Sequence, residues 1–182
     1  MPLLPWIIES ERLLAKTRIF ELREHQARSQ MQPDRAGHFV YLHTPQWINV
    51  IARTPGQEIL FVEQFRHGSR TLTLEIPGGM VDAGEDYATA GARELLEETG
   101  YAGDPPVLIG EVSPNPAMQD TRLGTIFIDN ARPVQAPSPD HHEELALVRH
   151  PQANLDALVR NGTIDHALVI AAFHHFRLWT QA

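Results

Sequence analysis

A glycine turn followed by an acidic run constrains this chain more than any other part of its sequence. Residues 79–101 read GMVDAGEDYATAGARELLEETGY, with four glutamates and no lysine. At about 100° per residue, an α-helix here places Glu94, Glu97 and Glu98 within roughly 100° of one another, on one face. Gly100 then stands where a helix favours a glycine just past its end. The face expected to pack on a core consists of Ala88, Ala92, Leu95, Leu96 and Thr99.

The clustered carboxylates have two interpretations. Like charges on one helical face destabilise it, and a solvated acidic face is the ordinary explanation of such a run. Solvated faces usually interleave lysine with glutamate, and this one has none. Oxygen ligands in a cluster are what a hard divalent cation requires. The sequence therefore favours a metal site, and we expect the small residues Ala90 and Gly91, one turn back, to leave room for a ligand.

The spacing of this stretch resembles the full signature of the Nudix hydrolases. The matching residues are Gly79, Glu85, Arg93-Glu94-Leu95, Glu97-Glu98 and Gly100-Tyr101. So many fixed residue types over 23 positions make the match specific. The resemblance implies an α/β protein with the Nudix fold, a mixed β-sheet sandwiched between α-helices, across roughly residues 45–180.

The same resemblance implies roles for individual residues. In that family the helix glutamates bind magnesium or manganese, and the substrates are nucleoside diphosphates linked to another group. The implied metal ligands are Glu94 and Glu98, with Glu97 and the carbonyl of Gly78 as further ligands. Glu97 and Glu98 thereby belong to the catalytic centre. A structural role is implied for Gly79, Glu85 and Arg93, the last two as a pair that holds the loop and helix in shape.

Hydrophobic patterning predicts the remaining elements. We expect residues 47–53 and 58–64 to form a hairpin, and the apolar run at residues 59–62 suits a strand covered on both faces. Helices are expected at about residues 151–160, beginning at Pro151, and at about residues 164–178. The predicted strands are residues 17–24, 38–44, 47–53, 58–64, 72–76, 107–112, 123–129 and 145–149.

The N-terminal residues lie outside the minimal Nudix fold. We divide the chain into an extension at residues 1–44 and a Nudix hydrolase domain at residues 45–182. A pair of strands ahead of the domain resembles the ADP-ribose and nucleoside diphosphate sugar pyrophosphatase branch. In that branch the N-terminal strands cross to the other subunit of a homodimer and help to build its substrate site.

Shorter matches support that branch. Residues 62–66, VEQFR, resemble the segment that supplies a substrate-binding arginine, here Arg66, which would otherwise be read as an ordinary surface residue. Residues 75–80, EIPGGM, resemble the entry to the signature, where Met80 lies against the ligand. Pro116 is placed as in ADP-ribose enzymes, but the surrounding SPNPA departs from their serine-proline-glycine form. This departure favours a broader nucleotide-sugar preference.

A carboxylate outside the helix is the expected general base. In relatives the base often comes from a loop after the signature, and Glu143 or Glu144 fills that place, with a solvated acidic loop as the alternative. We interpret His141 and His142 as surface residues, because magnesium prefers oxygen. Further substrate contacts are suggested for Arg18, Ile19 and Asp120, with Trp6 and Phe20 as possible stacking residues.

Composition sets the outer bounds. With 182 residues, 42% of them hydrophobic, one domain is expected. A net charge of −8 argues against a nucleic-acid partner, and no apolar run is long enough for a membrane span. The absence of cysteine excludes disulfides and thiol chemistry and is compatible with a cytoplasmic location.

The sequence thus predicts a magnesium-dependent enzyme, with manganese as a possible substitute. It would cleave ADP-ribose or a related nucleoside diphosphate sugar to a nucleoside monophosphate and a sugar phosphate. One alternative is a Nudix hydrolase of oxidised nucleoside triphosphates or dinucleoside polyphosphates. The other is a nucleotide-sensing module without hydrolysis.

Overall fold

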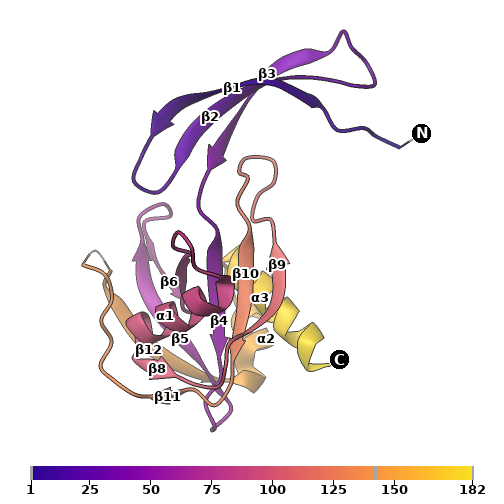
Figure 1. Ribbon diagram of the computed structural model, residues 1–182. Coiled ribbons are helices and arrows are strands. Elements are labelled where there is room, and N and C mark those ends of the chain that lie inside the picture. Colours follow the sequence, from indigo (N-terminus) through magenta and orange to yellow (C-terminus); the bar gives the residue numbers. More distant parts are fainter. Residues whose placement is uncertain (1, 142, 182) are drawn as a thin grey trace. The chain divides into compact units, whose positions relative to one another are not determined.

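The computed structural model describes residues 2–141 and 143–181, and these form two compact units (Figure 1). The N-terminal unit comprises the chain up to Pro45 together with residues 113–121. The main unit comprises residues 46–112 and the chain from Arg122 onwards. The segment at 113–121 joins the N-terminal unit through a bridge between Leu42 and Gln119.

The N-terminal unit is a three-stranded antiparallel sheet in the order β1-β2-β3. Its strands are β1 (Ile7–Lys16), β2 (Glu21–Arg28) and β3 (Ala36–His43). The expectation of only two strands here was wrong, because β1 was missed. A regular alternation of apolar and polar residues arises where one face of a strand is buried. All ten residues of β1 are exposed and its pairing with β2 shifts register twice, so its sequence lacks that alternation.

The main unit contains two larger sheets. One is four-stranded, in the order β7-β4-β10-β9, and it is mixed because β10 runs parallel to β4 while the other pairs are antiparallel. The other is antiparallel, in the order β12-β5-β6. The strands are β4 (Trp47–Ala52), β5 (Glu58–Arg66), β6 (Thr71–Glu75), β7 (Gly78–Met80), β9 (Val107–Val112), β10 (Leu123–Ile128) and β12 (Leu145–Pro151). Two short strands, β8 (Tyr101–Ala102) and β11 (Arg132–Pro133), pair with each other.

The predicted hairpin of residues 47–53 and 58–64 was wrong in its pairing. Both strands exist, but β4 and β5 belong to different sheets. Beyond their connecting turn, only Arg53 and Ile59 form a bridge within the described residues. Both strands are nearly continuous apolar runs, and Ile59–Val62 are fully buried as expected. A strand buried on both faces carries no local signal of which neighbour it pairs with.

The described residues of the main unit also form three helices: α1 (Tyr87–Thr99), α2 (Leu155–Arg160) and α3 (Ala167–Thr180). Pro151 is the last residue of β12 and not the start of a helix, because a 3₁₀ turn (Gln152–Asn154) precedes α2. Helix α1 contacts one face of the mixed sheet and α3 contacts the other (Figure 1). The predicted arrangement of a mixed sheet between helices is therefore confirmed.

Each face of the mixed sheet has its own hydrophobic core. Ile48 and Val50 of β4 pack with Leu95 of α1, whereas Ile51 packs with Phe176 of α3. The alternation along β4 sends successive side chains to opposite faces. None of the helices in the described part of the chain is both long enough and apolar enough to cross a membrane.

Candidate active site at the signature helix

Helix α1 has a defined start and end. The side chain of Asp86 accepts a hydrogen bond from the Thr89 backbone N–H at 2.8 Å and is the N-cap. Gly100 ends the helix in the left-handed region, with a φ of 74°. The glycine predicted just past the end of the helix is confirmed. With both ends fixed, the helix holds its glutamates in a defined position relative to the glycines of β7.

The expected division of α1 into a core face and an open face was only partly right. Leu95 and Thr99 are buried as predicted, but Ala92 is exposed. Ala90 and Gly91 are buried, and a Cβ on Gly91 would lie 3.0 Å from the Ile126 side chain. These small residues let the helix approach β10, so the expectation that they leave room for a ligand was wrong.

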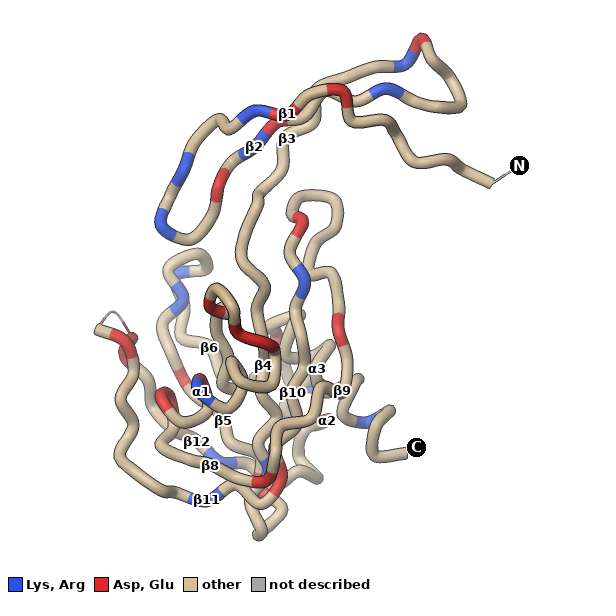
Figure 2. The backbone as a smooth tube through the Cα atoms, viewed as in Figure 1, with Lys and Arg blue, Asp and Glu red and all other residues tan. Residues whose placement is uncertain are grey.

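The helix is rotated so that Glu94 and Glu98 face the glycine loop. The Gly78 backbone N–H donates to Glu98 Oε2 at 3.1 Å. The Glu94 carboxylate lies so close to Gly79 that a Cβ there would overlap it. Acidic residues gather on α1 and on the loop before it (Figure 2). The Glu94 carboxylate thus requires a glycine at position 79, whereas a Cβ on Gly78 would overlap the backbone carbonyl of Ile48 in β4.

Burial shapes the electrostatics of these two carboxylates. The side chain of Glu98 is among the buried charged groups, with 4% of the residue exposed. Burial, reinforced by the charge of Glu94, raises the pKa of Glu98 to about 8. Burial also raises the pKa of Glu94 above its ordinary value. The charge of Glu143 contributes to both shifts, which places this loop residue within electrostatic range of the helix glutamates.

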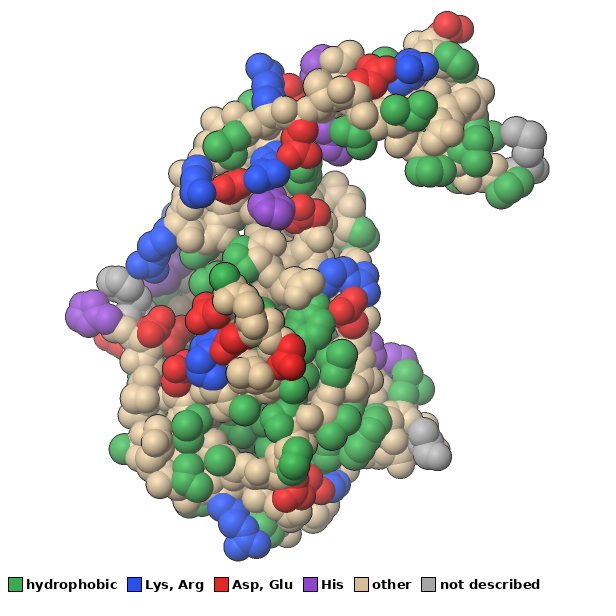
Figure 3. All heavy atoms as spheres, in the orientation of Figure 1, with side chains coloured by type: hydrophobic (Ala, Val, Ile, Leu, Met, Phe, Trp, Pro, Cys, Tyr) green, Lys and Arg blue, Asp and Glu red, His purple; other side chains and the backbone are tan. Residues whose placement is uncertain are grey.

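Arg93 links the acidic side chains around the helix. Its Nε donates to Glu85 Oε1 at 2.9 Å, so these two residues pair as the resemblance implied. Its Nη1 donates to Glu94 at 2.8 Å and to Glu97 at 3.0 Å, and its Nη2 donates to the Met80 carbonyl at 2.9 Å. Figure 3 shows acidic side chains gathered over α1 around basic ones. The arginine therefore connects the loop, β7 and the helix.

The predicted metal ligands do not already form a metal cage. No group of three or more His, Cys, Asp or Glu side chains in the described part of the chain is arranged to hold a metal ion. Glu97 is bound by Arg93 and its side chain is 43% exposed. The metal-binding roles of Gly78, Glu94, Glu97 and Glu98 thus remain predictions.

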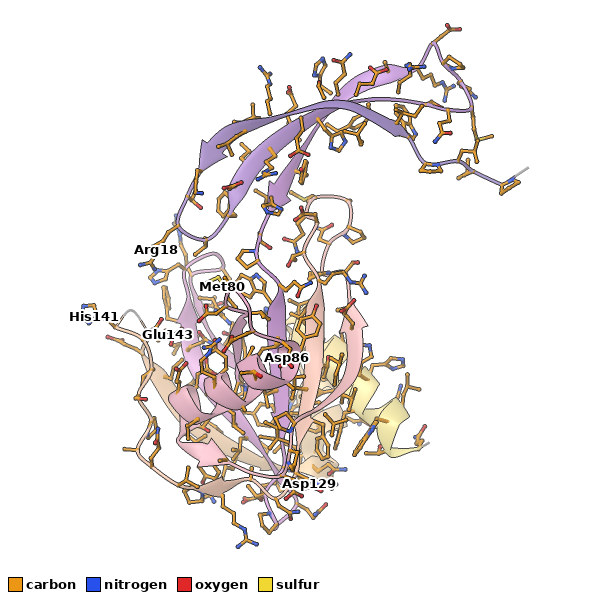
Figure 4. All side chains as sticks on the ribbon, in the orientation of Figure 1. Arg18, Met80, Asp86, Asp129, His141 and Glu143 are labelled. Atoms are coloured by element: carbon orange, nitrogen blue, oxygen red, sulfur yellow. The ribbon has the colours of Figure 1, made fainter. Side chains whose placement is uncertain are left out.

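A pocket of about 610 Å³ is lined in part by Arg66 and Glu143, both of which act electrostatically on Glu98. It is formed by the end of β5, the turn that follows it, and the loop before β12. That loop carries the labelled residues His141 and Glu143 (Figure 4). His142 lies outside the described residues. The lining residues are Gln64, Phe65, Arg66, His67, Gly68, His141, Glu143 and Glu144.

Arg66 is not an ordinary surface arginine. It lines the pocket and forms two hydrogen bonds with Glu75, at 2.7 and 2.8 Å. The sequence did not identify Glu75 as its partner, nor Phe65 and His67 as pocket residues. The sequence did contain a signal for this buried charge. Glu75 ends a strand and directly precedes a core residue, Ile76.

The other candidate substrate residues lie on different parts of the fold. Arg18 and Ile19 are in the exposed turn between β1 and β2. Asp120 pairs with His43 of the same unit, with His43 Nδ1 and Asp120 Oδ2 2.6 Å apart. Met80 lies on β7, opposite Trp47 of β4. Their contacts with substrate remain predictions.

A mixed sheet between helices, with an acidic helix following a glycine loop, defines the class of protein as Nudix-like. The model of the NUDIX domain family matches residues 42–173, and the chain belongs to this family. The fold agrees, because a crystal structure of an ADP compounds hydrolase superimposes with a TM-score of 0.84. That alignment covers 100% of this chain and 97% of the other at 19% identity.

Curated relatives are also similar in sequence. The chain is 33% identical to an ADP-sugar pyrophosphatase of Mus musculus over 147 residues, which are 72% of this chain and 63% of that protein. It is 40% identical to an ADP-ribose pyrophosphatase of Saccharomyces cerevisiae over 72 residues, which are 40% of this chain and 31% of that protein. The chain thus spans less than two thirds of the length of these relatives.

Proposed function

We propose that this protein is a magnesium-dependent pyrophosphatase that hydrolyses ADP-ribose or a related nucleoside diphosphate sugar. The products are a nucleoside monophosphate and a sugar phosphate. The observation that carries the proposal is the pair of carboxylates, half-buried Glu94 and buried Glu98, held against the glycines of β7. Arg66, which lines the pocket, acts electrostatically on Glu98. The names of the mouse and yeast relatives support the substrate class.

The chemistry of these residues fits a divalent cation. Two neighbouring carboxylates with raised pKa values oppose each other's ionisation, and a bound dication would stabilise both in the charged form. All the donors are oxygens, which suits Mg²⁺ and also Mn²⁺. Glu94 and Glu98 would hold the ion, with Glu97 and the Gly78 carbonyl as further ligands. When bound, the ion neutralises diphosphate oxygens and lowers the pKa of water.

Among the two candidate bases, we propose Glu143. Both Glu143 and Glu144 line the pocket, and the charge of Glu143 is among the main contributions to the raised pKa values of Glu94 and Glu98. It also acts electrostatically on Arg66. A carboxylate in this place accepts the proton of the attacking water as the water adds to phosphorus. Glu144 would then line the substrate side of the pocket.

Substrate binding is assigned to the pocket and its neighbours. Arg66 supplies a positive charge for the diphosphate, and Met80, which follows the two glycines of β7, would lie against the ligand. We also propose that Arg18, Ile19 and Asp120 contact the nucleotide. These three belong to the N-terminal unit, so their participation depends on how a homodimer brings the units together.

We further propose that the N-terminal sheet pairs with a second copy of the chain. Large apolar side chains are exposed on its strands, among them Ile8, Leu13, Phe39 and Val40. Exposed apolar surface on a sheet without covering helices is typical of a protein interface. With a net charge of −8 and no cysteine, we expect a cytoplasmic protein without nucleic-acid or membrane partners.

One assay tests the activity. ADP-ribose, ADP-glucose, UDP-glucose and nucleoside triphosphates are incubated with the protein, with Mg²⁺, with Mn²⁺, or with a chelator. We expect metal-dependent release of a nucleoside monophosphate and a sugar phosphate from at least one diphosphate sugar. Preferential turnover of triphosphates, or no turnover of any compound, would contradict the proposal.

A further inference from the structure

Arg66 is held in one orientation by a buried carboxylate. Its Nε donates to Glu75 Oε1 at 2.7 Å, and its Nη2 donates to Glu75 Oε2 at 2.8 Å. This two-bond geometry fixes the plane of the guanidinium. Because both bonds use the same edge, Nη1 is left to meet other acceptors. The Arg66 side chain is 41% exposed and that of Glu75 is 4% exposed, so the arginine reaches into the pocket from a buried anchor.

Glu75 is itself fixed by neighbouring elements. It ends β6 opposite Val62 of β5. Thr73 Oγ1 donates to Glu75 Oε1 at 2.7 Å, and His166 Nε2, just before α3, lies 3.9 Å from Oε2. Burial acts to raise the pKa of Glu75, but the hydrogen bonds from Arg66 and Thr73 outweigh burial and lower it. The carboxylate therefore stays charged and cannot turn away from Arg66.

Arg66 also has competing partners within electrostatic range. Glu98 and Glu143 both attract its positive charge, and both belong to the proposed catalytic centre. A long arginine side chain without Glu75 would be free to move toward these carboxylates. The contact with Glu75 opposes this move, because the move would break both hydrogen bonds to the buried carboxylate.

We propose that Glu75 is a positioning residue that aims Arg66 at the substrate diphosphate and keeps it away from Glu98 and Glu143. This role rests on the proposed function, because it concerns the affinity of the same pocket for its substrate. Glu75 acts through Arg66 and does not touch the substrate. Its loss should therefore weaken substrate binding only while Arg66 is present.

A double-mutant cycle tests this dependence. KM and kcat for ADP-ribose are measured with Mg²⁺ for the unmodified protein, Glu75→Gln, Arg66→Ala and the double variant. We expect Glu75→Gln to raise KM about 10-fold, because a neutral amide holds the guanidinium less firmly. In the Arg66→Ala background the same change should alter KM by less than about 2-fold.

Asp129→Asn is the matched control. Asp129 forms a similar two-bond pair with Arg53, at 2.9 and 2.5 Å, in the same unit. Figure 4 places Asp129 at the opposite end of that unit from Met80 and Glu143. Breaking this pair should lower the melting temperature but leave KM within about 2-fold of the unmodified value. A purely structural role of Glu75 would give the same result as this control.

The outcomes separate the positioning role from the proposed function. Turnover by the unmodified protein is measured first, and its absence would overturn both. Normal turnover with an unchanged KM in folded Glu75→Gln overturns the positioning role alone. The role is also overturned if Glu75→Gln raises KM as much in the Arg66→Ala background as in the unmodified protein. If Glu75→Gln does not fold, Thr73→Val replaces it, since it removes only one hydrogen bond to the same carboxylate. It should raise KM by more than about 2-fold, and a smaller change would overturn the role.

Discussion

Single side chains decide the chemistry of this protein. Glu98 is the clearest case, because a carboxylate that is 4% exposed and adjacent to Glu94 has a pKa raised to about 8. A site that holds two such groups side by side is less stable as the groups ionise, unless a cation joins them. This cost in the free protein is the reason that we expect the site to bind a divalent ion.

The first prediction concerns turnover. Glu98→Gln should lower kcat for ADP-ribose by about 100-fold or more, because the metal loses a charged ligand. The fold should be retained, since the amide still accepts from the Gly78 N–H without a buried charge. Steady-state kinetics and circular dichroism measure both effects. Normal hydrolysis by a folded Glu98→Gln variant would show that the metal assignment is wrong.

The second prediction concerns the pH dependence of the free energy of unfolding, measured with a chelator so that no metal is bound. The pKa of Glu98 is about 8 in the folded protein and ordinary, about 4.5, in the unfolded chain. Between these values the folded state binds more protons than the unfolded state, so stability falls as pH rises. The free energy of unfolding from urea titrations should therefore be larger at pH 5 than at pH 8. Glu98→Gln should reduce this difference, and an equal slope in both proteins would contradict the assignment.

At the level of elements, α1 works because its ends and one face are fixed. Asp86 caps its start, Gly100 closes its end, and Gly91 permits close contact with β10. These features set the rotation of the helix, and hence the direction in which Glu94 and Glu98 point. A small change at the cap should thus act on stability before it acts on catalysis.

The third prediction tests the cap. Asp86→Ala removes the acceptor for the Thr89 N–H and should lower the melting temperature by roughly 2–4 °C. Asp82→Ala is the matched control, because it removes the same charge from the same loop without removing a cap. Thermal unfolding followed by circular dichroism compares the two. An equal shift for both variants would mean that charge, not capping, is responsible.

The molecule as a whole consists of two units that differ in how much of their apolar surface is buried. The main unit buries apolar residues on both faces of its mixed sheet. The described part of the N-terminal unit contains no helix, and its sheet leaves large apolar side chains exposed, including Val40 at 51%. A three-stranded sheet with such surface gains stability by meeting another surface.

The fourth prediction is that the protein is a homodimer in solution. Sedimentation velocity across a range of concentrations should give a particle of about twice the 20.4 kDa chain mass. Val40→Asp and Leu13→Asp place charges on exposed positions of the N-terminal sheet and should shift the equilibrium toward monomer. A particle of single-chain mass at every concentration would exclude the shared-site proposal.

The local sequence was enough to predict the Nudix family and its signature helix. It was also enough for most strands of the main unit and for the glycine that ends the helix. These features depend on residue type and spacing within about 25 residues, which sequence displays directly. The strand β1 was missed because its exposed residues lack the alternation that burial imposes.

Only the tertiary structure decided how the pieces meet. It separated β4 from β5, turned Ala90 and Gly91 inward, paired Arg66 with Glu75, and brought Glu143 within range of Glu98. Each of these features depends on how the elements pack against one another. Many apolar surfaces compete for a place in the same core, and the outcome depends on all of them. Local periodicity carries no record of that competition, whereas the signature spacing lies within one helix and the loop before it and can be read directly from the sequence.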